Sequence, residues 1–222
     1  MAVVQGANVV LLGPPGAGKS TVANELCRLM PCDVVSTGVL LRQEIETGSA
    51  LGQHIGAMIN NGNLVSDEVM HQVLGAFLAR RDPQHNMVLD GYPRTMSQAA
   101  FLPTFLAQYR RTLTGVVLLD VADDVVVKRL SGRRMCVTAT ETFPVHVDDA
   151  AALAQCQARG GVLQMRVDDS PEIVLRRVQI YHETTAPLIA FFTQQQLLYR
   201  VDAHGSAVSI AQDVYALIER IQ

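Results

Sequence analysis

Apolar, β-branched runs alternate along the chain with stretches in which apolar residues recur at helical spacing. The runs predict five strands, at Asn8–Leu12, Asp33–Ser36, Met87–Asp90, Val116–Asp120 and Leu197–Val201. The helical spacing predicts six helices, at Ser20–Met30, Asp67–Arg80, Ser97–Tyr109, Ala122–Leu130, Pro171–Gln194 and Val208–Ile221. Strands and helices that alternate in this way favour a parallel sheet with helices on both faces. The pattern therefore predicts an α/β fold with a five-stranded parallel sheet.

Two segments do not follow the alternation. Residues 37–65 carry short helical signals interrupted by glycines at positions 38, 48, 52, 56 and 62, and residues 135–167 have no long apolar period. We interpret both as inserts at the C-terminal edge of the sheet, where they can close over a ligand and exclude water. The alternative is that they are loops without a function. Long loops in compact domains are usually functional or disordered, and the apolar residues of these two argue against disorder.

Composition and charge narrow the class of protein. The chain has 222 residues, 49% hydrophobic and 18% charged, which fits one α/β domain with inserts in a globular enzyme. The net charge of −3 gives no reason to expect nucleic acid or an anionic membrane as a partner. No apolar stretch approaches the ~20 residues of a membrane span, and no secretion signal is present. Four cysteines, at positions 27, 32, 136 and 156, indicate no disulfide framework, so we expect a cytoplasmic protein, and a monomer because no apolar stripe is self-complementary.

A glycine-rich segment, Gly13-Pro14-Pro15-Gly16-Ala17-Gly18-Lys19-Ser20, lies between the first strand and the first helix. Its glycines allow backbone N–H groups to turn toward phosphate oxygens, and the following helix directs its positive dipole end at the same anion. Lys19 adds a mobile positive charge, and Ser20 or Thr21 offers a hydroxyl to Mg²⁺. The alternative is a glycine-rich turn without a ligand. The flanking strand and helix favour a phosphate site.

A second chemical cluster is the segment from Val88 to Thr95. Its strand ends at Asp90, whose carboxylate is suited to hold Mg²⁺ through water, near the phosphate loop if the two strands are neighbours. Gly91 and Pro93 force a sharp turn, after which the guanidinium of Arg94 can bind a second phosphate group. An aspartate at a strand end is often structural on its own. Beside a phosphate loop, the functional interpretation is favoured.

Arginines flank both ends of the 135–167 insert. Arg129, Arg133 and Arg134 precede it, and the following arginines are Arg166, Arg176 and Arg177. Surface arginines are usually solvated, so each alone indicates little. Phosphoryl transfer, however, requires several cations around the transferred group.

These motifs, in this order, resemble the long-lid adenylate kinases, within the nucleoside monophosphate kinases. The matching segments are Gly13–Lys19, Ser36–Arg42, Asp90–Thr95 with Gln98, Arg129–Arg134, and Arg166–Asp169 with Arg177 and Tyr181. The resemblance covers nearly the whole chain. It implies a fold like that of the P-loop nucleoside triphosphate hydrolases. It also implies a core (1–35, 66–134 and 168–222), a helical monophosphate-binding insert (36–65) and a lid insert (135–167).

The resemblance also implies an activity, the reversible conversion of MgATP and AMP into two ADP, with a role in adenine nucleotide homeostasis and salvage. No covalent nucleophile is required. Residues implied to bind ATP are Gly13, Pro14, Gly16, Ala17, Gly18, Lys19, Ser20, Thr21, Arg129, Arg133 and His146. Residues implied to bind AMP are Thr37, Gly38, Leu41, Arg42, Ile59, Val65, Gly91, Arg94, Gln98, Arg166 and Arg177.

Within these sets, particular roles follow from the resemblance. The transferred phosphate is expected to meet Lys19, Arg129, Arg133, Arg166 and Arg177, with Asp168 orienting the arginines and Arg94 and Arg42 holding the AMP phosphate. Mg²⁺ is expected near Ser20 and Asp90, mostly through water. Gln98 is expected to contact adenine, because its amide offers both a donor and an acceptor.

The sequence departs from the family pattern most clearly in the lid. Many relatives carry two Cys-x-x-Cys pairs that bind a structural zinc ion, whereas here Ala139 and Arg159 stand three residues after Cys136 and Cys156. Two of the four ligands are missing, so we expect no zinc. His146 is a third ligand in principle, but it matches a position on the nucleotide side. Apolar packing among Phe143, Val145, Leu153 and Val162 is one way to hold such a lid together.

Two other functions stay open at this point. A related kinase could act on UMP, CMP or GMP, since Val39 stands in the monophosphate segment where an aspartate is common, although Thr37 and Gln98 favour adenine. An inactive, nucleotide-binding relative is the other alternative. The presence of Lys19, Asp90 and every expected arginine argues against it.

Overall fold

A five-stranded parallel sheet is the centre of the computed structural model, which describes residues 5–60 and 63–222; the glycine at position 62 lies outside these ranges. The strands stand in the order β2–β3–β1–β4–β8, and every pairing between neighbours is parallel. They span β1 (Asn8–Leu12), β2 (Cys32–Ser36), β3 (Asn86–Asp90), β4 (Gly115–Asp120) and β8 (Leu198–Asp202). The five strands predicted from the sequence are confirmed, each within one residue at either end.

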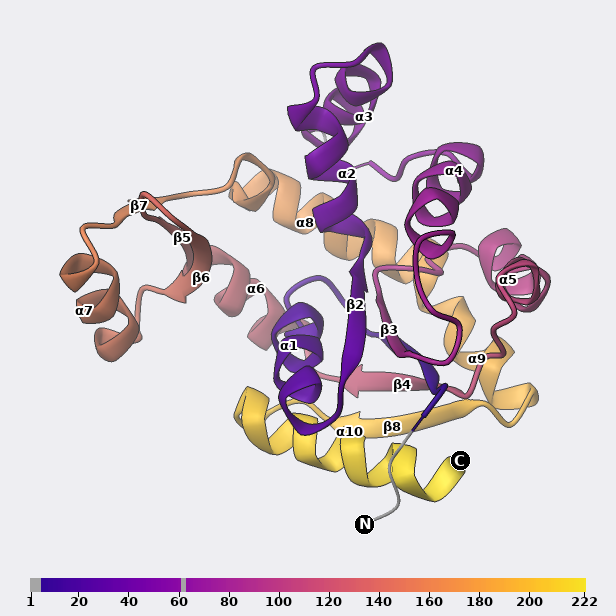
Figure 1. The fold of residues 1–222 in the computed structure, drawn as a ribbon. Coiled ribbons are helices and arrows are strands. Elements are labelled where there is room, and N and C mark those ends of the chain that lie inside the picture. Colours follow the sequence, from indigo (N-terminus) through magenta and orange to yellow (C-terminus); the bar gives the residue numbers. More distant parts are fainter. Residues whose placement is uncertain (1–4, 61–62) are drawn as a thin grey trace.

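Alternate residues of a strand point to opposite faces of the sheet, so the sheet has two apolar faces. Different helices cover each of them. Val9 and Leu11 of β1 belong to one apolar cluster, whereas Val10 and Leu12 belong to the other. The first cluster includes residues of α1 (Lys19–Leu29), α6 (Asp123–Ser131) and α10 (Ala207–Ile221), and the second includes residues of α4 (Asp67–Leu78), α5 (Met96–Gln108) and α9 (Pro187–Gln194). Figure 1 shows α1 beside α10, with α4, α5 and α9 together away from them. No helix of the described residues is long and apolar enough to cross a membrane.

The helix predicted over Pro171–Gln194 is interrupted in the structure. It forms α8 (Pro171–Ile180), a π-helical turn η2 (Tyr181–Thr185), and α9. Pro187 has no backbone N–H to donate, and its ring crowds the carbonyl group four residues earlier. The N–H of Ala186 instead donates to the carbonyl of Tyr181 at 2.8 Å, which gives the wider turn. The prediction of one continuous helix is therefore wrong at this point.

The two segments that interrupt the alternation have structure of their own. Residues 37–65 contain α2 (Thr37–Glu46) and α3 (Ala50–Asn60). Residues 135–167, which we call the lid segment, hold most of a small antiparallel sheet in the order β6–β5–β7. Its elements are β5 (Arg133–Val137), β6 (Thr142–His146), α7 (Ala150–Ala158) and β7 (Val162–Gln164), and a short turn η1 (Val167–Asp169) follows. Figure 1 shows this small sheet with α7, apart from the parallel sheet and connected to it through α6 and α8.

A disulfide bond between Cys136 and Cys156 joins β5 to α7 inside the lid segment. Both cysteines are buried, and Val145, Phe143 and Leu153 pack around them. The expectation of no disulfide framework is therefore wrong, and it is wrong a second time at Cys27–Cys32, which joins the end of α1 to the start of β2. The spacing of the cysteines does not reveal either pairing, because each depends on how strand and helix fold back on one another.

Polar and cationic contacts complete the lid segment. Arg159 forms an ion pair with Glu141, and its guanidinium lies 5.5 Å from the centre of the Phe143 ring. Val162, expected in the apolar packing, is instead 61% exposed because it lies on the edge strand β7. A disulfide, an ion pair and a small apolar cluster therefore connect the residues at positions where a zinc site would be expected in relatives. The expectation of a lid without zinc stays a prediction.

Removal of the lid disulfide should loosen the lid without unfolding the core. The double variant Cys136→Ala, Cys156→Ala opens a loop with a sequence separation of 20 residues. On the chain-entropy account, this costs the lid about 3 kcal/mol of stability. Hydrogen exchange at the amides of β5, β6 and β7 should accelerate accordingly. The control Cys27→Ala, Cys32→Ala should leave these amides unchanged, and unaltered lid exchange in the first variant would contradict the disulfide's role.

Candidate active site

The glycine-rich loop after β1 ends in a helix N-terminus that faces an open cleft. Gly18 caps α1 with a left-handed backbone conformation at φ 90°, and the first turn of α1 holds no acidic residue that would compensate the helix dipole. Lys19 donates from Nζ to the carbonyl groups of Gly13 and Pro14, each at 2.8 Å. Burial lowers the pKa of Lys19 to about 8, against the opposing effect of Asp90. A partly buried cation at the N-terminus of a helix is an arrangement that an anion stabilises.

Asp90 lies beside this loop because β3 is the neighbour of β1. Leu11 pairs with Asp90 in the sheet, so the two strands end at the same edge. The carboxylate is buried and accepts hydrogen bonds from Ser20 Oγ and, at 3.1 Å, from Ser36 Oγ. From the sequence, Asp90 was expected near the loop if its strand lies next to the first strand. The sheet order confirms that β3 and β1 are neighbours.

A tight turn after β3 directs Arg94 back toward the cleft. Gly91 has a φ of 87°, and a Cβ atom there would lie 2.8 Å from Arg94 Nη2. Arg94 donates from Nε to the Gly91 carbonyl at 2.8 Å, while Thr37 Oγ1 donates to the same carbonyl at 3.1 Å. Burial lowers the pKa of Arg94, although Asp90 and Asp168 partly offset this effect. The turn therefore keeps a partly buried guanidinium at the cleft.

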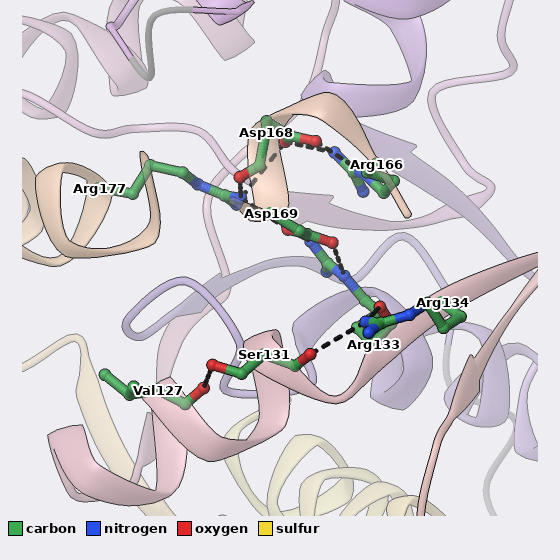
Figure 2. A network of polar contacts seen from close by, with 8 residues as sticks. All are labelled: Val127, Ser131, Arg133, Arg134, Arg166, Asp168, Asp169 and Arg177. Carbon is green, nitrogen blue, oxygen red and sulfur yellow. Dashed lines mark hydrogen bonds and ion pairs between the residues drawn. The ribbon is translucent and has the colours of Figure 1, made fainter. Parts of the chain in front are cut away.

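Two adjacent carboxylates hold three arginines where the lid segment meets the core (Figure 2). Asp169 accepts from Arg133 Nε at 2.7 Å, and Asp168 accepts from Arg166 Nε at 2.8 Å, each pair having a second contact through Nη2. Arg177 joins the two pairs through hydrogen bonds to both aspartates. Burial tends to raise the pKa of Asp168, but Arg166 and Arg177 outweigh it and hold this pKa below its usual value.

One cleft of about 950 Å³ connects all these groups. Every site residue expected from the sequence lines the cleft except Pro14 and Ala17, which are buried within the loop. Arg129 reaches across to the core and donates to the Ala203 carbonyl at 2.9 Å. Burial and the nearby cations Arg166 and Arg133 lower the pKa of Arg42 to about 10, with Asp168 acting against them. The inserts and the sheet edge thus enclose one strongly cationic site.

The model of the adenylate kinase family matches residues 11–197, which include every residue that lines the cleft. The chain belongs to the adenylate kinase family. The fold expected from the resemblance, a parallel sheet of the P-loop type, agrees with this membership.

Individual adenylate kinases are similar to the chain over nearly its full length. The enzyme of Thermosipho melanesiensis is 35% identical over 96% of this chain and 100% of its own. That of Desulfitobacterium hafniense is 35% identical over 95% of this chain and 97% of its own. The adenylate kinase of Moorella thermoacetica is 37% identical over 87% of this chain and 89% of its own. The similarity therefore includes the lid segment as well as the core.

Asp169 is a residue of this network to which the sequence analysis assigned no role. Its side chain is fully buried and holds Arg133 from the opposite end of the lid segment, with Arg177 as a further partner. The resemblance included Asp169 in a matching segment but implied a role for Asp168 alone. A signal was present in the sequence, because two consecutive aspartates stand between arginines at 166 and 177.

The substitution Asp169→Asn should destabilise the protein strongly. It keeps the side-chain volume but removes the charge that Arg133 and Arg177 need at a buried position, which costs about 3 kcal/mol. Denaturant unfolding measures the loss. The matched control is Asp120→Asn, whose partner Arg200 lies at 2.8 Å with both side chains more than half exposed, and it should cost less than ~1 kcal/mol. Equal losses in the two variants would rule out this role for Asp169.

Proposed function

We propose that the chain catalyses the reversible transfer of a phosphoryl group from MgATP to AMP, which yields two molecules of ADP. The observation that carries the proposal is a single cleft lined by two separate sets of phosphate-binding groups, the glycine loop with Lys19 and the pair Arg42 and Arg94. An enzyme that only hydrolysed ATP would have no use for the second set. Membership of the adenylate kinase family supports the same reaction.

The ATP side is built on the loop and the lid segment. Backbone N–H groups between Gly13 and Gly18 and the N-terminus of α1 receive the phosphates of ATP. Lys19 exchanges its two carbonyl partners for phosphate oxygens, which relieves the cost of burying its charge. Arg129 and His146 line the cleft on the lid side and cover the nucleotide.

The AMP side is built on α2 and on the turn after β3. Arg42 and Arg94 hold the AMP phosphate, because both guanidiniums line the cleft and burial penalises each of them until an anion arrives. Thr37, Val65 and Gln98 also line the cleft, and they contact the nucleoside of AMP. The residues Gly38, Leu41, Ile59 and Gly91 complete this side.

The residues at the edge of the sheet fit Mg²⁺. Ser20 and Asp90 present a hydroxyl and a carboxylate oxygen to one point, and Mg²⁺ prefers few protein ligands of this kind together with water and phosphate. No group of three or more His, Cys, Asp or Glu side chains in the described ranges could bind a metal by itself. When bound, the ion neutralises charge that develops on the phosphate oxygens.

Transfer itself needs position and positive charge rather than a nucleophile on the protein. Arg133, Arg166 and Arg177 stand in fixed orientations because Asp168 and Asp169 hold them before substrate enters. Phosphate oxygens then compete with these carboxylates for the same guanidinium N–H groups. The arginines therefore surround the transferred group without having to be ordered at the moment of reaction. Closure of the lid segment excludes water from this step.

The cellular role that follows from this reaction is adenine nucleotide homeostasis and salvage. We place it in the cytoplasm and propose that the chain acts as a monomer, with ATP, AMP and ADP as its small-molecule partners. Neither nucleic acid nor a membrane enters the proposal. The two disulfides make the redox state of the purified protein worth measuring, since a reducing cytoplasm opposes them.

Nucleotide chromatography tests the proposal directly. With Mg²⁺ and ATP, we expect ADP to form when AMP is added and far less to form from UMP, CMP or GMP. The variant Lys19→Met should lower the rate about 100- to 1,000-fold, because a charge at the transferred group is lost. The control Lys128→Met, at an exposed position on α6, should keep the normal rate. Preference for another monophosphate would overturn the assignment of the base, and no transfer with any would favour an inactive relative.

The variant Arg94→Ala should separate the two nucleotide sides. Loss of a charged hydrogen-bonding partner is expected to raise the KM for AMP about 10- to 100-fold and the KM for ATP much less. Steady-state kinetics with each substrate varied in turn provides the measurement, and circular dichroism checks the fold. The exposed Arg80→Ala serves as the control. Equal effects on both KM values would refute the assignment of Arg94 to AMP.

A further inference from the structure

Gln98 has a fixed amide orientation in this structure. Its Oε1 accepts from the backbone N–H of Arg94 at 2.7 Å, and its Nε2 donates to Asp67 Oδ1 at 2.7 Å. A backbone N–H can only donate and a carboxylate can only accept, so these two partners permit one orientation of the amide. The side chain is buried apart from the edge that lines the cleft. Gln98 therefore presents its remaining lone pair and its remaining N–H in fixed positions.

Asp67 stands behind Gln98 and outside the cleft. It is the first residue of α4, after the N-cap Ser66, and it does not line the site. Its second oxygen accepts from Ser97 Oγ at 2.5 Å, and Ser97 in turn contacts Thr95, the N-cap of α5. The carboxylate is thus held at the junction of α4 and α5, outside the lining of the cleft.

We propose that Asp67 is a positioning residue that makes the monophosphate site selective for adenine over 6-oxopurines. This inference rests on the proposed function, since it assigns Gln98 to the base of AMP. Adenine offers a donor at its 6-amino group beside a ring acceptor, which matches an amide whose oxygen and N–H are both fixed. Guanine and hypoxanthine carry an oxygen at the same position. That oxygen would meet Gln98 Oε1, and only a flipped amide could donate to it.

Asp67 makes a flip of the Gln98 amide energetically unfavourable. A turned amide would place Oε1 against the carboxylate and Nε2 against the N–H of Arg94, so both existing bonds would become repulsive contacts. An uncharged partner at position 67 weakens this barrier, because an amide there can rotate to donate as well as to accept. The preference for adenine over 6-oxopurines would then decrease, while the contacts to the AMP phosphate and to ATP stay unchanged.

The variant Asp67→Asn, isosteric with the native residue, tests the proposal by calorimetric binding of AMP and of GMP. We expect the ratio of the two affinities, AMP over GMP, to fall about 10-fold, which is the difference between a hydrogen bond to a charged and to a neutral acceptor. Affinity for ATP should not change. The control Glu68→Gln removes a charge from the same first turn of α4 at an exposed position and should leave the ratio intact. Ser97→Ala, which frees one carboxylate oxygen, should lower the ratio by a smaller factor.

The outcomes separate this inference from the proposed function. Turnover of ATP and AMP by the unaltered chain decides the function, whereas the binding ratio decides the role of Asp67 whether or not turnover occurs. A uniform loss of AMP and GMP affinity in Asp67→Asn would mean that Asp67 is only structural and would overturn the proposal. So would an unchanged ratio, or a native chain that binds neither nucleotide.

Discussion

The crowding of positive charge in one cleft is the constraint on which the rest of this structure depends. Lysine and arginine side chains converge there, and burial lowers the pKa values of four of them, Lys19, Arg42, Arg94 and Arg177. Three carboxylates offset the repulsion among these cations. Asp90 acts on the loop side, while Asp168 and Asp169 act where the lid segment joins the core. The protein therefore holds its cations in place with groups that a substrate can replace.

The parts of this site that the sequence predicts are those carried by short, continuous segments. The strand, the glycine loop and the start of α1 are consecutive, so their geometry follows from local chemistry once the apolar run before Gly13 is recognised. The same holds for Asp90 to Arg94, where the strand end and the turn are adjacent. The neighbour relation between β1 and β3 could not be read from the sequence, because parallel sheets of this kind are wound in more than one strand order, and the structure establishes it.

What the sequence could not supply are pairings between distant residues. The bond between Cys136 and Cys156, the ion pair of Arg133 with Asp169, and the contact of Asp67 with Gln98 each join elements that packing alone brings together. Periodicity also fails where an apolar pattern continues through a change of helix type, as at Tyr181–Thr185. The lid segment is the extreme case, because β5 and β6 each bury one residue and β7 buries none, so no apolar run marks these strands.

The positions of the two disulfides have a mechanical consequence. Cys136–Cys156 lies within the lid segment and Cys27–Cys32 within the parallel-sheet core, so neither covalent link crosses from one to the other. Each disulfide stiffens the part in which it lies, but neither of them fixes the lid segment relative to the core.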